Sequence, residues 1–279
     1  MRDAPFLVHE PAAGGEGAGE TALIVEIPHS GVLVPPQFMP ELIAPARAIG
    51  RDADLYVDEL YEGAHLDGAT VLVARTSRYV VDLNRAHDDI DAESAVSGRS
   101  PSSPRGVVWR TTTEGQRALS GPLTEEAFEA RLGEIYRPYH AALRDLVRRK
   151  LATFGRAVIL AAHSMPSVAR LAHGDPGRVR ADVVPGSRGR TSAAARYIDA
   201  VDAHARARGW SVAHDDPYKG GFTTQHYGRP GDQVHVVQVE LARRLYMDEA
   251  TYRRSPGGFE DVHAWCRSLV RKLGALSLD

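Results

Sequence analysis

Four stretches of the chain are almost entirely apolar and stop at polar or turn-forming residues. They cover residues 22–27, 70–74, 157–162 and 234–241. Runs of this length that are rich in Val, Ile and Leu, without polar alternation, are typical of strands buried on both faces. Shorter apolar runs over residues 79–83 and 181–184 predict two further strands.

Apolar residues at helical spacing lie between and after these runs. The clearest helix runs from Thr124, an N-cap followed by two glutamates, to Phe154, and Pro138 is expected to kink it. Further helices are predicted from about residues 52–54, over 191–208 and over 259–276. Because strands alternate with helices and no strong hairpin signal occurs, we expect a three-layer α/β/α fold with a mostly parallel sheet.

Two segments show neither pattern. Residues 1–20 include a run of small residues and glycines that cannot form a core, so we expect a flexible N-terminal leader. Residues 21–279 are then expected to form a single α/β domain. Residues 86–122 are polar and rich in Ser, Gly and Pro, and a loop of this length is usually functional or disordered.

The composition is that of an ordinary globular protein. The 279 residues are 25% charged and 43% apolar with a net charge of −2, which gives no reason to expect binding to nucleic acid or a membrane. The basic residues Arg144, Arg148, Arg149 and Lys150 near the end of the helix predict a solvated helix face. No export signal or membrane-span pattern occurs, so we expect a cytoplasmic protein.

The single cysteine, Cys266, excludes an internal disulfide and a cysteine-rich zinc site. It lies in the apolar stripe of the last predicted helix, where we expect it to act as a small buried hydrophobe. The sequence carries no signal for the oligomeric state.

Two histidines directly follow the apolar runs: His29 after the first and His163 after the third. Ligands of open α/β sheets bind outside the carboxyl ends of the strands, so both side chains are candidates to face one crevice. A catalytic zinc typically takes three protein ligands from histidine and carboxylate groups. Asp52 or Asp54, at the start of the next helix, could supply the third. The alternative is that both histidines are hydrogen-bonded structural residues.

Glu240 interrupts the last apolar strand, and a glutamate is almost never buried without a partner or a task. Beside a metal, such a carboxylate could take a proton from water and pass it to a leaving amine. The alternative is a surface ion pair with Arg243 or Arg244.

Arg85 follows the apolar run over residues 79–83 and is a candidate anchor for an anionic substrate. Its guanidinium suits the bidentate binding of a carboxylate. An ion pair with Asp82, Asp88 or Asp89 explains the residue equally well.

The irregular stretch 216–230 combines a glycine pair with Lys219, His226 and Arg229. Loops of this kind are common at binding sites, and Gly221 would allow a ligand to approach the backbone closely. The stretch does not match a phosphate-binding Walker loop. A flexible surface loop is the alternative.

Ser30 and Ser164 raise the question of a serine nucleophile. Neither lies in a G-x-S-x-G motif, and each directly follows its histidine. Neighbouring residues at a strand end point in opposite directions, so either serine would need a distant partner.

The ordered set of motifs resembles the N-formylglutamate amidohydrolases. The matching pieces are Pro28-His-Ser-Gly31, Asp82-Leu-Asn-Arg85, Tyr136-Arg-Pro-Tyr-His140, Ala162-His-Ser-Met165, the loop from Lys219 to Gly228, Gln238-Val-Glu-Leu241 and Leu245-Tyr-Met-Asp-Glu249. They run in order from about residue 22 to residue 249. The resemblance implies a phosphorylase/hydrolase-like α/β/α fold, shared with zinc carboxypeptidases. It also implies zinc-dependent hydrolysis of N-formyl-L-glutamate to formate and glutamate, late in histidine degradation.

Carried over by position, the resemblance implies roles for particular residues. It makes His29, His163 and an acid at the helix start, for which we favour Asp54 over Asp52, the metal ligands. It makes Glu240 the catalytic base and acid.

The resemblance further implies that Asn84, Arg85, Gly221 and His226 meet the substrate. The sequence around His226 departs from the family pattern, in which a basic residue is expected before the histidine, and this leaves recognition of the substrate side chain open.

The sequence therefore predicts a zinc-dependent amidohydrolase that acts on a small anionic substrate. Another divalent metal could take the place of zinc, because sites of histidine and carboxylate accept several ions. Two alternatives come from other classes: a metal-free serine esterase, and a non-catalytic protein that binds acidic metabolites.

Overall fold

The apolar runs form the centre of a six-stranded mixed sheet in the computed structural model, which describes residues 4–12, 19–91, 93–96, 105–170 and 174–276. The strands are β1 (Phe6–His9), β2 (Leu23–Ile27), β3 (Thr70–Ala74), β4 (Ala157–Met165), β5 (Val183–Gly186) and β6 (Val234–Ala242). Their order in the sheet is β1-β3-β2-β4-β6-β5. The four inner strands are parallel, and β1 and β5 are antiparallel to their neighbours at the two edges.

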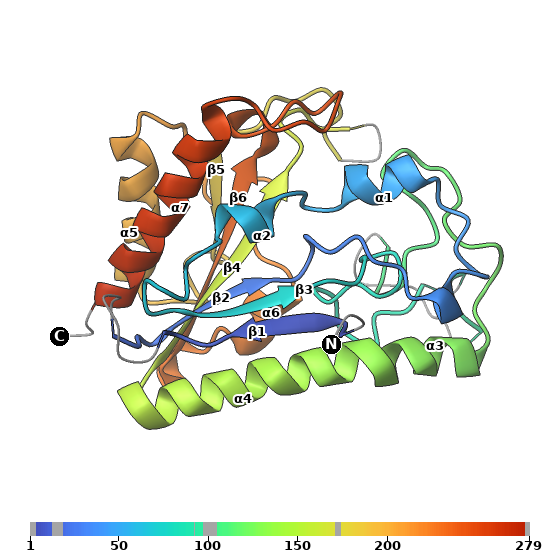
Figure 1. Cartoon of the computed structure of the whole chain (residues 1–279), viewed down its shortest axis with the longest axis horizontal. Coiled ribbons are helices and arrows are strands. Elements are labelled where there is room, and N and C mark those ends of the chain that lie inside the picture. The colour runs from blue at the N-terminus through green and yellow to red at the C-terminus, as the bar shows by residue number, and fades with distance from the viewer. Residues whose placement is uncertain (1–3, 13–18, 92, 97–104, 171–173, 277–279) are drawn as a thin grey trace.

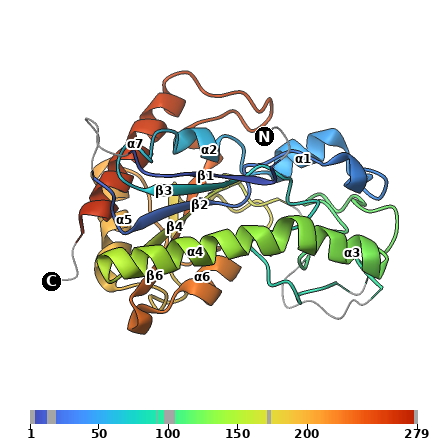
Figure 2. The same ribbon diagram turned by 60° about the horizontal axis from the view of Figure 1, so that its bottom comes forward.

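Helices cover both faces of this sheet (Figures 1 and 2). The helices are α1 (Ala46–Asp52), α2 (Val57–Leu60), α3 (Glu125–Arg131), α4 (Arg137–Phe154), α5 (Ala195–Ala207), α6 (Phe222–Tyr227) and α7 (Gly258–Ala275). Side chains of α2, α5 and α7 pack in the core on one face, and those of α3, α4 and α6 in the core on the other. The predicted three-layer α/β/α architecture with a mostly parallel sheet is confirmed.

The alternation of side chains along β4 sets the position of the site. Val158, Leu160 and Ala162 point into the core beneath α5 and α7, whereas Ile159 and Ala161 point into the core beneath α4. Because successive side chains of a strand point to opposite faces, His163 continues the row of Ile159 and Ala161. His163 therefore lies on the α4 face of the sheet, at the carboxyl end of β4.

Two predictions about the sheet are wrong. Phe6–His9, inside the predicted flexible leader, form edge strand β1, because an apolar segment there can pair with the free edge of β3. Residues 13–18 of the leader lie outside the described residues. Residues 79–83 form turns rather than a strand. Strand β3 already has β1 and β2 as its neighbours, so it offers no free edge to this segment. The apolar side chains of residues 79–83 are buried in the core without pairing to the sheet.

The predicted helix over residues 124–154 is interrupted. A π-helical turn over Leu132–Tyr136 separates α3 from α4, and Pro138 lies in the first turn of α4, where its missing N–H is tolerated. Thr124 caps α3 by accepting a hydrogen bond from the Ala127 amide at 3.1 Å.

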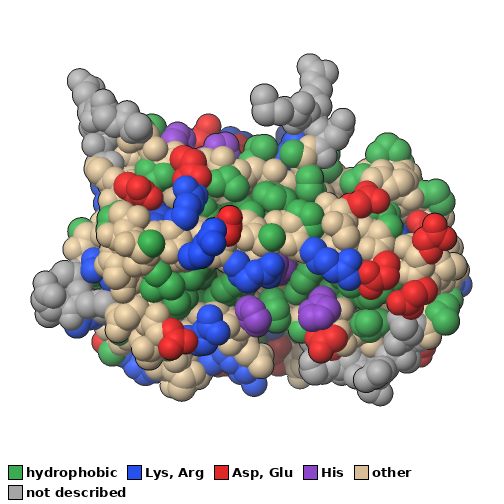
Figure 3. Space-filling model, turned by 90° about the horizontal axis from the view of Figure 1, so that it is seen from below, with side chains coloured by type: hydrophobic (Ala, Val, Ile, Leu, Met, Phe, Trp, Pro, Cys, Tyr) green, Lys and Arg blue, Asp and Glu red, His purple; other side chains and the backbone are tan. Residues whose placement is uncertain are grey.

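The basic run at the end of α4 is only partly solvated. Figure 3 shows the α4 face of the molecule, across whose middle basic side chains follow one another. Arg148 and Arg149 are exposed and pair with Asp145 and Glu10. Lys150 instead is buried and donates to the Thr21 carbonyl at 2.6 Å, so it ties α4 to the start of β2.

None of the helices in the described part of the chain combines the length and apolar character needed to cross a membrane.

The turn after β2 is pressed against the segment after β3. The Leu33 amide donates to the Arg75 carbonyl at 3.0 Å, and the Ser77 amide donates to the Leu33 carbonyl at 2.8 Å. A Cβ added to Gly31 would overlap the backbone of Arg75. The missing side chain of Gly31 therefore lets the chain pass close to Arg75 two residues after His29.

We predict that Gly31→Ala lowers the free energy of unfolding by about 1–3 kcal/mol, because the added methyl group must displace backbone rather than a flexible side chain. Gly121→Ala is the matched control, since no atom lies within 4 Å of its added Cβ, and it should change stability by less than about 0.5 kcal/mol. Urea denaturation of both variants measures the difference. Equal stability of the two variants would contradict the packing argument.

Candidate metal centre

Two histidines and an aspartate converge at the carboxyl ends of the central strands. His29 follows β2, His163 lies near the end of β4, and Asp54 follows α1. All three side chains are buried, and one ligand atom from each lies within 4.8 Å of the others. Asp54 Oδ2 is 2.9 Å from His163 Nδ1 and 3.7 Å from His29 Nδ1.

The fold explains this convergence. β2 and β4 are parallel neighbours, so their carboxyl ends meet at the same edge of the sheet. The Asp54 amide donates to the His29 carbonyl at 2.9 Å, which fixes the end of α1 against the end of β2. Buried Arg243 donates to the carbonyls of Arg51 and Ala53, each at 2.6 Å, and its guanidinium lies 3.5 Å from Asp54 Oδ1.

Each imidazole has a second partner on its far nitrogen. Asp82 Oδ1 lies 2.7 Å from His29 Nε2, and Asn84 Nδ2 lies 3.3 Å from His163 Nε2. The Nδ1 atoms of both rings are thereby directed toward Asp54. A carboxylate such as Asp82, which accepts the far N–H of the ring, orients a metal-binding histidine and raises its basicity.

The donor set fits a divalent cation. Two imidazole nitrogens and a carboxylate oxygen are the usual protein ligands of a catalytic zinc, and a buried cluster excludes competing water. Burial alone would raise the pKa of Asp54, but hydrogen bonds and positive charge from His163 and His29 lower it well below its ordinary value. Asp54 is therefore anionic at neutral pH, as a carboxylate ligand of a cation must be.

Asp52, the other predicted candidate for the acidic ligand, is engaged elsewhere. It accepts hydrogen bonds from the Tyr79 hydroxyl, from the amide and hydroxyl of Thr113, and from Arg170 at 3.0 Å. These bonds join α1 to two loops, so Asp52 holds the surroundings of the site together while Asp54 faces the histidines.

Glu240 lies beside the cluster. Its residue on β6 is the register partner of His163 on β4, so both side chains leave the sheet on the same face. Gln238 donates to Glu240 Oε1 at 2.9 Å. Burial raises the pKa of Glu240 to about 7, with the charge of Asp54 adding to the rise and that of His163 opposing it. A carboxyl group with this pKa can both accept and release a proton near neutral pH.

The alternative interpretation of Glu240, a surface ion pair with Arg243 or Arg244, is contradicted by the described residues. Glu240 is buried, Arg243 lies against Asp54, and Arg244 pairs with Asp182 at 2.7 Å.

Asn84 and Gly221 form part of the wall beside His163. The Asn84 side-chain oxygen accepts from the Thr223 amide at 2.9 Å, at the start of α6. A Cβ on Gly221 would overlap the Asn84 side chain, and the Gly221 amide donates to Gln238 at 2.9 Å. The loop before α6 is thus connected both to His163 and, through Gln238, to Glu240.

Arg85 and His226 have different surroundings. Arg85 donates to the Asn84 carbonyl at 3.0 Å, and among the described residues its buried Nε has no hydrogen-bond partner. None of the ion pairs found in the described ranges joins it to Asp82, Asp88 or Asp89. His226 is exposed on α6 and stacks on Phe222, with ring centroids 4.8 Å apart. No contact in the described part of the chain brings His226 to the histidine cluster.

Two residues of the site have no signal among the sequence motifs. Arg78 donates to Asp82 Oδ2 at 2.7 Å and so supports the partner of His29. Glu26 is a fully buried residue in β2. Glu26 Oε1 accepts from Tyr139 at 3.0 Å and from Thr223 at 3.1 Å, and Oε2 has no partner among the described residues. Its charge within an apolar strand is the signal that singled out Glu240, and it was overlooked because no motif surrounds it.

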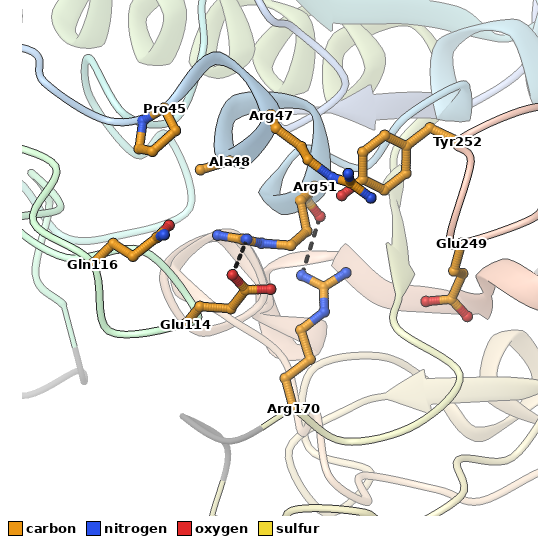
Figure 4. Close-up of a pocket in the computed structure, with 9 residues that line it drawn as sticks. All are labelled: Pro45, Arg47, Ala48, Arg51, Glu114, Gln116, Arg170, Glu249 and Tyr252. Atoms are coloured by element: carbon orange, nitrogen blue, oxygen red, sulfur yellow. Dashed lines mark hydrogen bonds and ion pairs between the residues drawn. The ribbon is translucent and has the colours of Figure 1, made fainter.

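A cavity of about 440 Å³ opens beside α1 (Figure 4). Its two inner arginines have acidic partners: Arg51 pairs with Glu114 at 2.5 Å, and Arg170 pairs with Asp52 at 3.0 Å. The third, Arg47, is exposed and donates to the Ala250 carbonyl at 3.0 Å. None of the lining residues belongs to the histidine cluster, so this cavity is a neighbour of the candidate centre rather than part of it.

Comparison with known proteins gives consistent matches over most of the chain. The family model described as N-formylglutamate amidohydrolase matches residues 21–247. The N-formylglutamate deformylase of Pseudomonas aeruginosa is 35% identical over 262 residues, which cover 91% of this chain and 92% of that protein. The Pseudomonas putida N-formylglutamate deformylase is 33% identical, over 84% of this chain and 86% of its own. The crystal structure of N-formylglutamate amidohydrolase from Ralstonia eutropha JMP134 superposes with a TM-score of 0.86 at 32% identity, covering 97% of each chain.

The buried carboxyl group of Glu26 gives a test of the site's electrostatics. Burial raises its pKa above the ordinary 4.5, so ionisation costs the folded state more than the unfolded state once the pH exceeds that value. We predict that Glu26→Gln becomes more stable relative to the wild type as the pH rises from 4.5 to 8. Thermal unfolding at several pH values, in buffers with a chelator, measures this trend.

Glu126→Gln, at an exposed position of α3, is the control and should show no such trend. A stability difference between Glu26→Gln and the wild type that stays constant with pH would contradict the prediction.

Proposed function

The chain belongs to the N-formylglutamate amidohydrolase family, and from that premise we propose that it hydrolyses the formyl amide of N-formyl-L-glutamate, or of a similar N-acylated acidic amino acid, to formate and glutamate. The observation that carries the proposal is the buried cluster of His29, Asp54 and His163 with Glu240 beside it. We place the reaction in histidine degradation on the strength of the same family membership.

The metal ligands in this proposal are the Nδ1 atoms of His29 and His163 and the carboxylate of Asp54. Zinc is the expected ion, and another divalent metal could replace it. When bound, such an ion supplies Lewis acidity, which polarises an amide carbonyl and acidifies water. Asp82 accepts from His29 Nε2 and so holds that ring in the required orientation from behind, and the Asn84 side chain lies beside the far nitrogen of His163.

Glu240 is the proton carrier in this proposal. Its carboxylate takes a proton from the attacking water, whose oxygen bonds to the formyl carbon. As the carbon–nitrogen bond breaks, the same carboxyl gives the proton to the amine nitrogen of glutamate. Gln238 engages Oε1, so we assign the transfer to Oε2, and the pKa of about 7 suits both directions.

The substrate is anionic, and we propose that Arg85 binds one of its carboxylates. The buried Nε of Arg85 lacks a partner among the described residues, which leaves a donor for such a group. Asn84 and Gly221, which line the wall beside His163, are the nearest of the proposed substrate contacts to the cluster. His226 would meet substrate only at the outer rim, because it is exposed.

A serine esterase fits the site less well. Ser164 Oγ accepts from Arg243 Nε at 3.3 Å, and the buried Ser30 hydroxyl has no partner within the described residues. Neither hydroxyl is hydrogen-bonded to a histidine there, and such a bond is what activates a serine nucleophile.

We predict that Glu240→Gln keeps its bound metal but loses roughly 10²–10⁴ in kcat for formate release from N-formyl-L-glutamate, because proton transfer is removed while the ligands remain. Glu260→Gln, at an exposed position in the first turn of α7, is the control and should retain wild-type activity. Coupled detection of formate, together with elemental analysis, measures both quantities.

Wild-type rates in Glu240→Gln would refute the role of Glu240. Wild-type protein that binds N-formyl-L-glutamate without releasing formate would instead be a binding protein for acidic metabolites.

A further inference from the structure

We propose that Arg105, together with Trp109 and Arg78, forms a subsite that binds the side-chain carboxylate of the substrate and so selects acidic amino acids. The inference rests on the proposed function, and it assigns a residue that the sequence motifs do not mark.

Arg105 has no acidic partner among the described residues. In the described part of the chain its guanidinium makes neither an ion pair nor a hydrogen bond, and its Nε is buried without a partner. The guanidinium instead lies 4.9 Å from the centre of the Trp109 ring. A partly buried arginine held only by an aromatic ring is arranged to receive an anion from outside the chain.

Like charges surround Arg105. Burial lowers its pKa, and the positive charges of Arg78 and Arg85 lower it further. Gathering three guanidiniums in a partly buried region costs free energy, and an incoming carboxylate would offset that cost. Arg78 is paired with Asp82, so the charge that remains to be neutralised lies on Arg85 and Arg105.

Trp109, like Arg85 and Arg105, has a hydrogen-bond donor without a partner in the described part of the chain. It is only 4% exposed, and within the described residues its indole N–H has no hydrogen-bond partner. Arg78 also lies against its ring, 4.2 Å from the centre. Arginine and tryptophan side chains can donate hydrogen bonds but not accept them, so the chemistry of the group selects an oxygen-rich anion.

The subsite adjoins the catalytic cluster. Arg78 binds Asp82, which binds His29, and the Asp82 amide donates to the Val107 carbonyl at 2.7 Å. The segment that carries Arg105 and Trp109 is therefore fixed beside the metal ligands.

Arg105 is the member of this group that the contacts place farthest from the histidines. Arg105 lies over Trp109, Arg78 lies over the same ring, and Arg78 binds Asp82, the partner of His29. An outer position suits the carboxylate farther from the amide, which is the one on the side chain.

The arginines of the neighbouring cavity do not compete for this role. Arg51 and Arg170 have carboxylates of the chain itself as partners, whereas Arg105 has none among the described residues. Arg47, the third arginine of that cavity, is exposed, so its charge is already solvated. Only an uncompensated guanidinium gains a full charge-assisted hydrogen bond from the substrate.

The test compares N-formyl-L-glutamate with N-formyl-L-glutamine, which has the same shape but no side-chain charge. We expect Arg105→Met to lower the preference for the glutamate compound, as a ratio of kcat/KM values, by about 10- to 100-fold. Its kcat/KM for the glutamine compound should stay within about threefold of wild type. Arg105→Lys keeps the charge without the bidentate fork and should retain part of the preference.

Arg117→Met is the matched control. Arg117 lies on the same loop, is exposed, and donates only to the Ser120 carbonyl at 2.6 Å, so its loss should leave the preference unchanged. Thermal unfolding of each variant verifies folding, and Arg105→Lys carries the test if Arg105→Met does not fold.

The outcomes separate this inference from the proposed function. Wild-type protein that releases no formate from either compound would overturn the proposed function. An active wild type with an unchanged preference in both Arg105 variants would overturn the subsite alone. Equal losses on the two compounds would also overturn it, since Arg105 would then act on the amide rather than on the side-chain carboxylate.

Discussion

The site depends on one interaction, the contact of the Asp54 carboxylate with the imidazoles of His29 and His163. A buried carboxylate must be paired, and Asp54 finds its partners only because β2 and β4 are parallel neighbours that end at the same edge of the sheet. Its own amide is bonded to the His29 carbonyl, and Arg243 holds the carbonyls just before it. The three ligand atoms are thereby fixed before any ion binds, and this preorganisation is what a catalytic metal site requires.

Charge is balanced in the centre of the site and left unbalanced at its rim. Arg78 pairs with Asp82, and Arg243 lies against Asp54, so the positive charges nearest the histidines have partners in the chain. Farther out, Arg85 and Arg105 lack acidic partners among the described residues. In the proposed function, the first of these parts holds the metal and the second receives the anionic substrate.

Much of the fold was predictable because the strongest sequence signals arise from burial. Strands buried on both faces give long apolar runs, and the polar residues that end them, such as His29 and His163, lie where parallel sheets bind ligands. The choice between Asp52 and Asp54 depended on the turn at the end of α1, which sequence periodicity does not resolve. Strand β1 and the turns over residues 79–83 depended on which sheet edges were free. Arg78 and Arg105 each contact a residue four positions away, Asp82 and Trp109, and the two pairs meet only where Arg78 lies over the Trp109 ring, a packing contact that no local sequence pattern marks.

Removal of the metal tests the central claim most directly. Wild-type protein is purified, its divalent metal content is measured by elemental analysis, and formate release from N-formyl-L-glutamate is followed before chelation, after chelation and after metal is restored. The account predicts about one ion for each chain, loss of activity together with that ion, and recovery of both on restoration. Full formate release from protein shown to contain no divalent metal would contradict it.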